Sequence, residues 1–208
     1  MRDEELMRAA ESHLKASGRR MAALVEAIGP CQITYTPPTF ESLARSIVYQ
    51  QISIHAARSV YGKLRGACCG DGELHPAHVL PFCEAELRAC GLSAQKARYI
   101  RDLAAKTEAG LVEFPRFPSM SDDEVIAELT QVKGIGLWTA QMFLIFSLRR
   151  PDIWPTGDLG IRNAVQKLHR LKAHPTPAET EARGRKWRPY ASIACWYLWR
   201  SLEPTGPF

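Results

Sequence analysis

The sequence lacks any hydrophobic run long enough to cross a membrane. A membrane-spanning helix needs roughly 18–20 mostly apolar residues, and no stretch of the 208 residues comes close. The start of the chain, Met1 to Glu5, is charged and carries no apolar segment of the kind that a secretory signal requires. We therefore expect a cytoplasmic protein with no membrane partner.

The six cysteines lack the spacings of a metal or disulfide site. No CxxC pair occurs, and the histidines do not complete a zinc-binding spacing. Cys68 and Cys69 are adjacent, which suits neither a small disulfide scaffold nor a metal-binding knuckle. We expect reduced thiols, as in a cytosolic protein.

The alternation that marks β-strands is missing as well, and apolar residues recur at helical spacing instead. Met7, Ala10 and Leu14 show this near the start of the chain. The pattern predicts an all-α protein with roughly ten helices. The expected helices lie at 4–28 with a break at Ser17-Gly18, 39–50, 53–65, in short pieces within 76–90, at 93–108, 121–132, 137–148, from 158, from 176 and at 189–202, with loops at 30–39, 66–75, 114–118 and 150–157.

The size and composition allow one globular domain or two small ones with a shared cleft. Hydrophobic residues make up 46% of the chain, enough for a well-packed core. We expect a central helical domain at residues 40–148 and a second one formed by residues 1–39 plus 149–208. The net charge of +5 favours an anionic partner such as nucleic acid, although many proteins without one are equally basic.

The most informative segment runs from Leu129 to Ala140, where two glycines lie between two apolar helices. Gly134 and Gly136 allow the backbone to approach a ligand closely. The second helix begins just after Gly136, so its free N–H groups form an anion site that suits a DNA phosphate, with Lys133 adding charge. The alternative is an ordinary tight turn between helices.

This segment resembles the helix-hairpin-helix of the DNA glycosylase superfamily that is named after that motif. The hairpin, at about 121–148, is followed by Trp154 to Gly160, which resembles the Gly/Pro-rich loop and aspartate of that superfamily. The closer resemblance is to the 3-methyladenine DNA glycosylase II family, in its compact form without the N-terminal β domain. Further matching segments are Ile47 to Ser53, Gly91-Leu92-Ser93 with Lys96-Ala97, and Lys186 to Tyr190 with Trp196-Tyr197.

The resemblance implies a base excision repair enzyme that hydrolyses the N-glycosidic bond of alkylated bases in double-stranded DNA. Its catalytic carboxylate would be Asp158, which can also serve simply as a helix N-cap. Trp138 stands where relatives that nick the strand carry a nucleophilic lysine, so we expect no lyase activity. Gly157 replaces the usual acidic neighbour of the aspartate. Only Cys195 follows the catalytic loop, which excludes the iron–sulfur cluster of some relatives.

Other roles follow from the resemblance by position. The flipped base would contact an aromatic pocket, for which core packing is the alternative at Tyr197, Trp187 and Trp199. Gln51, backed by Ile52, would fill the gap in the duplex, or cap a helix. A structural Na⁺ or K⁺ would be held by backbone carbonyls, and no cofactor is needed for catalysis. The residues are, for the pocket, Trp138, Trp196, Tyr49, Met142 and Tyr197; for DNA, Lys133, Gly134, Gly136, Thr139, Gln51 and Ile52; for the ion, Thr130, Val132 and Ile135; and, as a basic set that either touches DNA or is only solvated, Arg183, Arg185, Lys186 and Arg188.

Three alternatives remain open from the sequence. The first alternative is a DNA-binding helix-hairpin-helix protein without catalysis. The second is a glycosylase for another lesion class, and the third is a helical protein that binds a small molecule. The sequence does not fix which alkylated base is preferred, among 3-methyladenine, 7-methylguanine, 1-methyladenine and 3-methylcytosine. We expect a monomer, associated with the nucleoid if the source is bacterial.

Overall fold

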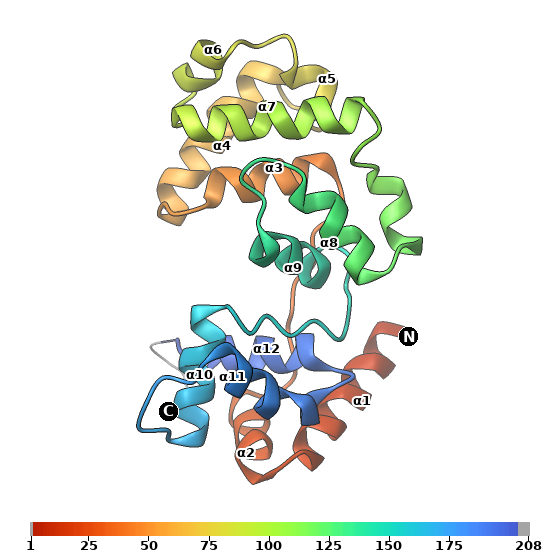
Figure 1. Ribbon diagram of the computed structural model, residues 1–208, viewed down its shortest axis with the longest axis vertical. Coiled ribbons are helices and arrows are strands. Elements are labelled where there is room, and N and C mark those ends of the chain that lie inside the picture. Colours follow the sequence, from red (N-terminus) through yellow and green to blue (C-terminus); the bar gives the residue numbers. More distant parts are fainter. Residues whose placement is uncertain (1, 204–208) are drawn as a thin grey trace. The chain divides into compact units, whose positions relative to one another are not determined.

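The computed structural model describes residues 2–203, and side chains from residue 4 onwards. Within this range the chain forms α-helices and two short 3-10 helices (η) without any strand, which confirms the all-α prediction (Figure 1). The elements are α1 (Arg2–Ala16), α2 (Arg19–Ile28), α3 (Phe40–Tyr49), α4 (Ile54–Cys68), α5 (Pro76–Val79), α6 (Glu84–Ala89), α7 (Ala94–Glu108), η1 (Phe114–Ser119), α8 (Asp122–Thr130), α9 (Leu137–Phe146), α10 (Leu159–His169), α11 (Pro177–Gly184), η2 (Arg185–Trp187) and α12 (Ala191–Arg200).

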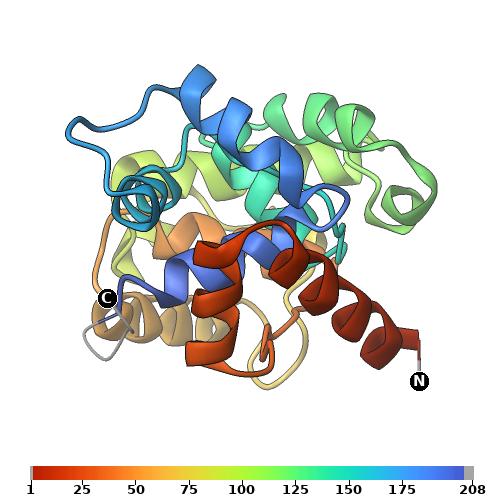
Figure 2. The ribbon, with the colours of Figure 1, turned by 90° about the horizontal axis from the view of Figure 1, so that it is seen from below.

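The helices belong to two compact units. The central unit is Thr36–Leu148 and contains α3 to α9. The terminal unit joins the described residues up to Tyr35 with those from Arg149 onwards, so α1 and α2 pack with α12 although they lie at opposite ends of the sequence (Figure 2). Each unit therefore has a core of its own.

Capping side chains set the start of several helices, as the sequence predicts. The hydroxyl of Ser53 accepts a hydrogen bond from the N–H of Ala56 at the start of α4. At α8, Ser121 and Glu124 form a reciprocal capping box. A cap of this kind contributes about 1 kcal/mol. Local sequence thus fixes where these helices begin.

The loop predicted at 66–75 begins three residues later than expected. Helix α4 continues to Cys68, and the carbonyl of Arg65 accepts hydrogen bonds from the N–H groups of both Cys69 and Gly70. Gly70 has a φ of +61°, so it supplies the left-handed residue that ends the helix. Gly66, the first glycine of the segment, lies inside α4, so the prediction that the loop begins at this residue was wrong.

The loop predicted at 114–118 is instead the 3-10 helix η1. Phe114 and Phe117 are buried, and their rings pack edge-to-face at 5.4 Å. Both also contact the ring of Phe143 on α9, at 6.0 and 5.8 Å. Because the prolines favour a tight turn and the aromatic rings need burial, the segment winds into a short helix against α9.

The core of the terminal unit is rich in aromatic residues. Trp154 and Trp187 pack edge-to-face with ring centroids 5.0 Å apart, and the indole N–H of Trp154 donates to the carbonyl of Thr180 at 3.1 Å. Gly184 lies directly against Trp154, where a side chain would collide with the ring. This packing ties the segment that precedes α10 to α11 and η2.

Two findings bear on the expectations from composition. No helix among the described residues is both long and apolar enough to span a membrane. All six cysteines are free thiols, and burial raises the pKa of Cys31 and Cys68 to about 11. The thiols of Cys31 and Cys68 are therefore protonated at neutral pH.

Candidate functional site

The hairpin between α8 and α9 needs one of its two glycines for the fold. Gly134 has a φ of +84°, and a side chain there would collide with the ring of Tyr99. Gly136 is the N-cap of α9 with a φ of −94°, and no atom of the described residues beyond its chain neighbours lies within 4 Å of the place where its side chain would be. The fold therefore demands glycine at 134, whereas Gly136 leaves open space at the N-terminus of α9.

The turn of the hairpin is tied to two other elements of the central unit. The N–H of Lys133 donates to Oδ2 of Asp102 at 2.8 Å, and the side-chain amide of Gln50 donates to the carbonyl of Gly134 at 3.1 Å. Burial raises the pKa of Asp102, but the bonds from Lys106 and from the Lys133 N–H outweigh it and the pKa lies below its ordinary value. The turn is thus held by an ionised carboxylate, while the Lys133 side chain remains exposed.

The carbonyls that the resemblance assigns to a monovalent ion lie in this turn. The Val132 carbonyl accepts the N–H of Ile135 at 3.1 Å, and the Thr130 hydroxyl donates to the carbonyl of Ile126. A carbonyl oxygen has two lone pairs, so one hydrogen bond leaves capacity for a cation. In the part of the chain that the structure describes, no group of three or more His, Cys, Asp or Glu residues is placed to hold a metal ion.

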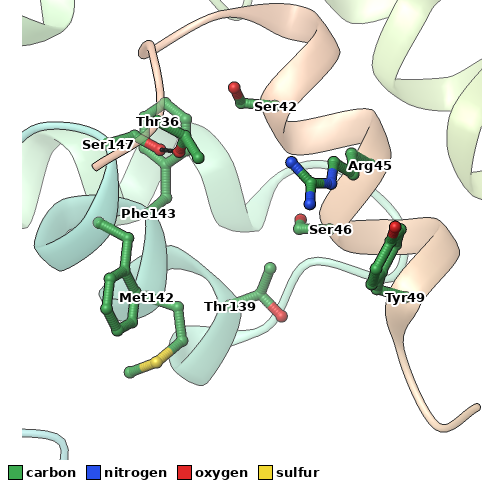
Figure 3. A pocket seen from close by; sticks show the side chains of 10 residues that line it. Thr36, Ser42, Arg45, Ser46, Tyr49, Thr139, Met142, Phe143 and Ser147 are labelled. Atoms are coloured by element: carbon green, nitrogen blue, oxygen red, sulfur yellow. Dashed lines mark hydrogen bonds between the residues drawn. The ribbon is translucent and has the colours of Figure 1, made fainter. Parts of the chain in front are cut away.

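All three predicted base-contacting residues of the central unit line one pocket between α3 and α9. It consists of two adjoining hollows of about 530 and 250 Å³, which share Ser46, Tyr49, Thr139 and Met142 (Figure 3). Trp138, half exposed at 50%, lines the larger hollow together with Gln51, which is expected to fill the gap in the duplex. Thr139 is buried and its hydroxyl accepts from Gln50 at 3.4 Å. It therefore belongs to the wall of this α3–α9 pocket.

Sequence reasoning missed Arg45, which also lines the α3–α9 pocket. Its guanidinium lies 5.1 Å from the ring centroid of Tyr49, one helical turn further along α3 (Figure 3). The far end is closed by a hydrogen bond of 2.9 Å between the hydroxyls of Thr36 and Ser147. The arrangement offers aromatic and sulfur surface, several hydroxyls and one positive charge. The signal was the i, i+4 spacing of Arg45 and Tyr49.

The turn after α3 carries Gln51 and Ile52, the two residues expected to fill the gap in the duplex, in a strained and exposed conformation. Gln51 has a φ of +55°, and Ile52 is 41% exposed. The ammonium of Lys96 donates to the carbonyls of Val48 and Gln50, each at 2.7 Å. Burial lowers the pKa of Lys96. This cation satisfies carbonyls at the C-terminus of α3, so it fixes the residue that precedes Gln51.

In the terminal unit, Asp158 is the N-cap of α10 and is only 8% exposed. Its Oδ1 accepts the N–H of Ile161 at 2.7 Å and the indole N–H of Trp199 at 3.0 Å. The cap role expected from the sequence is confirmed. Sequence reasoning left core packing as the alternative role of Trp199. Its bond to Asp158 was missed because 41 residues separate the two partners.

The two predicted pocket aromatics of α12 differ in exposure. Trp196 is half-buried, with the guanidinium of Arg200 5.8 Å from its ring centroid. Tyr197 is fully buried, and its hydroxyl donates to Glu11 at 3.1 Å and to the carbonyl of Gly29 at 3.0 Å. The burial of Tyr197 favours the core-packing alternative, and Trp196 keeps surface with which a base can make contact.

The basic set before α12 is partly neutralised. Arg188 pairs with Asp152 at 3.0 Å and with Glu181 at 3.7 Å. Arg185 and Lys186 are exposed. Burial, followed by the charges of Lys186, Arg183 and Arg20, lowers the pKa of His169 to about 4. The local potential is therefore positive, although Arg188 serves an internal ion pair.

Comparison with known proteins identifies the family. Residues 44–189 match the model of the HhH-GPD superfamily of base excision DNA repair proteins. The chain belongs to this superfamily, which confirms the resemblance seen in the motifs.

Individual relatives agree with the family match. The chain is 33% identical to the DNA-3-methyladenine glycosylase 1 of Schizosaccharomyces pombe over 93% of this chain and 87% of that protein. Solved structures are similar too. A 3-methyladenine DNA glycosylase of the same yeast in complex with abasic DNA matches with a TM-score of 0.81 and 33% identity over 93% of this chain and 96% of that one. A DNA-3-methyladenine glycosidase from Bacillus halodurans matches with a TM-score of 0.83 and 35% identity over 92% and 88%.

Proposed function

We propose that this chain is a monofunctional DNA glycosylase that hydrolyses the N-glycosidic bond of alkylated bases, of the 3-methyladenine and 7-methylguanine type, in double-stranded DNA. The observation that carries the proposal is Asp158, a nearly buried carboxylate held at a helix N-terminus by two donors. The names of the relatives support the substrate class.

The chemistry asks for one fixed negative charge. When the bond between C1′ and the base breaks, the electron pair leaves with the base and positive charge develops on the sugar. The Asp158 carboxylate stabilises that charge and orients the water whose oxygen bonds to C1′, while the proton of the water is released. A base alkylated on a ring nitrogen is already cationic and leaves easily, so no strong general acid is required.

The proposal excludes strand cleavage by the enzyme itself. A lyase needs an amine that attacks C1′ and forms a Schiff base. Trp138 occupies the position after the hairpin where such relatives carry lysine, and an indole is not a nucleophile of this kind. The product is therefore an abasic site in an intact strand.

The remaining site residues take roles in holding DNA. The flipped base contacts the α3–α9 pocket through Tyr49, Met142 and Trp138. In the terminal unit, the family resemblance assigns Trp196 to base contact as well, and Tyr197 supports the Trp196 ring from the core of that unit. Gln51 and Ile52 fill the gap in the duplex. The phosphate backbone is bound by Lys133, Gly134 and Gly136, and Thr139 contacts DNA from the wall of the α3–α9 pocket. The carbonyls of Thr130, Val132 and Ile135 hold a structural Na⁺ or K⁺, and catalysis needs no cofactor. The enzyme acts as a monomer in the cytoplasm.

Base release tests this proposal. Purified protein is incubated with duplex DNA that carries methylated bases, and free bases are separated from the DNA before and after alkali. Release of methylated purines, with nicks that appear only after alkali, is the expected result. Binding of the duplex without release of any base would instead favour a DNA-binding protein without catalysis, or an enzyme for another lesion class.

A further inference from the structure

Asp158 and Trp199 meet although they lie on different helices. The indole N–H of Trp199, on α12, is 3.0 Å from Oδ1 of Asp158, at the start of α10. The same oxygen accepts the N–H of Ile161 at 2.7 Å. One bond comes from the helix that Asp158 caps, and the other comes from a neighbouring helix of the same unit. Hydrogen-bond donors from two different helices therefore orient the carboxylate.

Gly160, which has no side chain, allows the indole of Trp199 to approach the Asp158 carboxylate closely. A Cβ at Gly160 would lie 3.1 Å from Asp158 Oδ1 and 3.1 Å from Cδ1 of the Trp199 ring. The backbone of Gly160 is not in the left-handed region, so its conformation does not demand glycine. The close approach of the indole to the carboxylate explains the glycine.

We propose that Trp199 is a positioning residue for the glycosylase reaction, which acts by fixing the orientation of the Asp158 carboxylate. This inference rests on the proposed function. A donor from a second helix on the same oxygen restricts rotation of the carboxylate about its last torsion more than the cap bond from Ile161 does by itself. Electrostatic stabilisation of a transition state depends on charges that are already in place before the reaction.

Core packing is the competing explanation, because the partly buried indole N–H of Trp199 needs an acceptor and Asp158 supplies one. The two explanations differ in what the N–H does for the rate. If Trp199 only fills space, phenylalanine replaces it with a cost in stability alone. If Trp199 positions the carboxylate, the loss of the N–H lowers the rate of the chemical step.

The first test compares Trp199→Phe with wild type under single-turnover conditions on a duplex with one methylated base. We expect the rate of base release to fall about tenfold to hundredfold, in line with the cost of misplaced catalytic groups. The Kd for a duplex with an abasic-site analogue should stay within about twofold of wild type, because Trp199 is not among the residues assigned to DNA binding. An unchanged rate would overturn the inference.

The matched control is Trp187→Phe in the same unit. Trp187 is fully buried, and its indole N–H has no hydrogen-bond partner among residues 4–203. This substitution removes the same atoms from the same core and should lower the melting temperature without a loss of rate. Gly160→Ala is the second variant, since its methyl group presses on both Oδ1 and the indole. It should reduce the rate as Trp199→Phe does, and a normal rate in either variant that folds would overturn the inference.

A double-mutant cycle separates this inference from the function on which it rests. Residual base release by Asp158→Ala is compared with that of the Asp158→Ala/Trp199→Phe double variant. No further loss in the double variant is expected, because Trp199 acts through Asp158. An equal fold-loss in both backgrounds would show that Trp199 acts independently and overturn the inference. Full activity of Asp158→Ala itself would overturn the proposed role of Asp158 and, with it, that of Trp199.

Discussion

The backbone N–H of Lys133 donates to the carboxylate of Asp102 at 2.8 Å, so the turn of the hairpin is tied to the middle of α7. Lys106, one helical turn from Asp102, bonds the same oxygen at 2.5 Å. The lysine of the hairpin therefore contributes its backbone to the fold and leaves its ammonium for a partner. This separation of roles makes the hairpin testable residue by residue.

The two hairpin glycines should respond differently to alanine. Gly134→Ala forces a side chain into the left-handed region and against the Tyr99 ring, so we expect the free energy of unfolding to fall by about 2–4 kcal/mol. Gly136→Ala meets open space at an ordinary φ and should change stability by less than about 0.5 kcal/mol. Urea unfolding measures both. DNA affinity should nevertheless fall in Gly136→Ala if phosphate approaches there, and equal losses of stability in the two variants would contradict the account.

The Asp102 anchor predicts a pH-dependent stability. Because the pKa of Asp102 in the folded chain lies below its ordinary value of 3.8, its contribution is fully present above that value and is lost as the pH falls through the lower folded value. Asp102→Asn should cost about 1–2 kcal/mol at pH 7. Urea unfolding at pH 7 and at pH 3 should show that the difference from wild type shrinks at the lower pH. A difference of the same size at both values would mean that the charge of Asp102 is irrelevant.

Lys96 should control the turn that carries Gln51. Lys96→Met keeps the aliphatic stem but leaves the carbonyls of Val48 and Gln50 without their cation, so we expect a loss of about 1–3 kcal/mol in stability. The Kd for a duplex with an abasic-site analogue should rise several-fold, since Gln51 is no longer presented in one conformation. Lys63→Met, at an exposed position on α4, is the matched control and should leave both quantities unchanged. An unaltered Kd in Lys96→Met would separate this turn from DNA binding.

Arg45 predicts a preference among damaged bases. The guanidinium of Arg45 beside Tyr49 repels a cationic base such as 7-methylguanine and leaves a neutral one such as 1,N6-ethenoadenine unaffected. Arg45→Met should therefore raise the single-turnover rate for the cationic base relative to the neutral one, by about threefold to tenfold. The ratio of the two rates in one preparation is the measurement, because it is independent of the active fraction. A ratio equal to that of wild type would place Arg45 outside the base pocket.

Local sequence was sufficient for the helices that carry their own signals. The Ser53 cap and the Ser121–Glu124 capping box depend on neighbours three residues away, so their patterns are visible in the sequence. The hairpin is visible as a motif of two glycines, although its contacts with Tyr99 and Asp102 are not. The prediction of a loop at residues 114–118 was wrong, because burial of the aromatic rings against Phe143 decides the conformation of this segment. That burial depends on a partner 26 or more residues away.

The candidate site divides in the same way. Asp158 and the hairpin glycines stand out because of a motif with fixed spacing. Asp102 and Trp199 do not, since each meets its partner across 31 and 41 residues respectively. Tyr197 illustrates the reverse case, where a motif position suggests a pocket residue but the hydroxyl is committed to Glu11 and Gly29 in the core. Supporting contacts of this kind come from tertiary packing, which no local pattern encodes.

The central claim is that Asp158 is the catalytic carboxylate, and Asp158→Asn tests it most directly. Asparagine keeps the shape and an oxygen that can accept the N–H groups of Ile161 and Trp199, so the fold and the affinity for abasic duplex should be retained. The measurement is single-turnover release of methylated bases from duplex DNA by wild type and variant. We predict a loss of rate of at least about hundredfold with unchanged DNA binding. Release at the wild-type rate would contradict the account and reduce Asp158 to a helix cap.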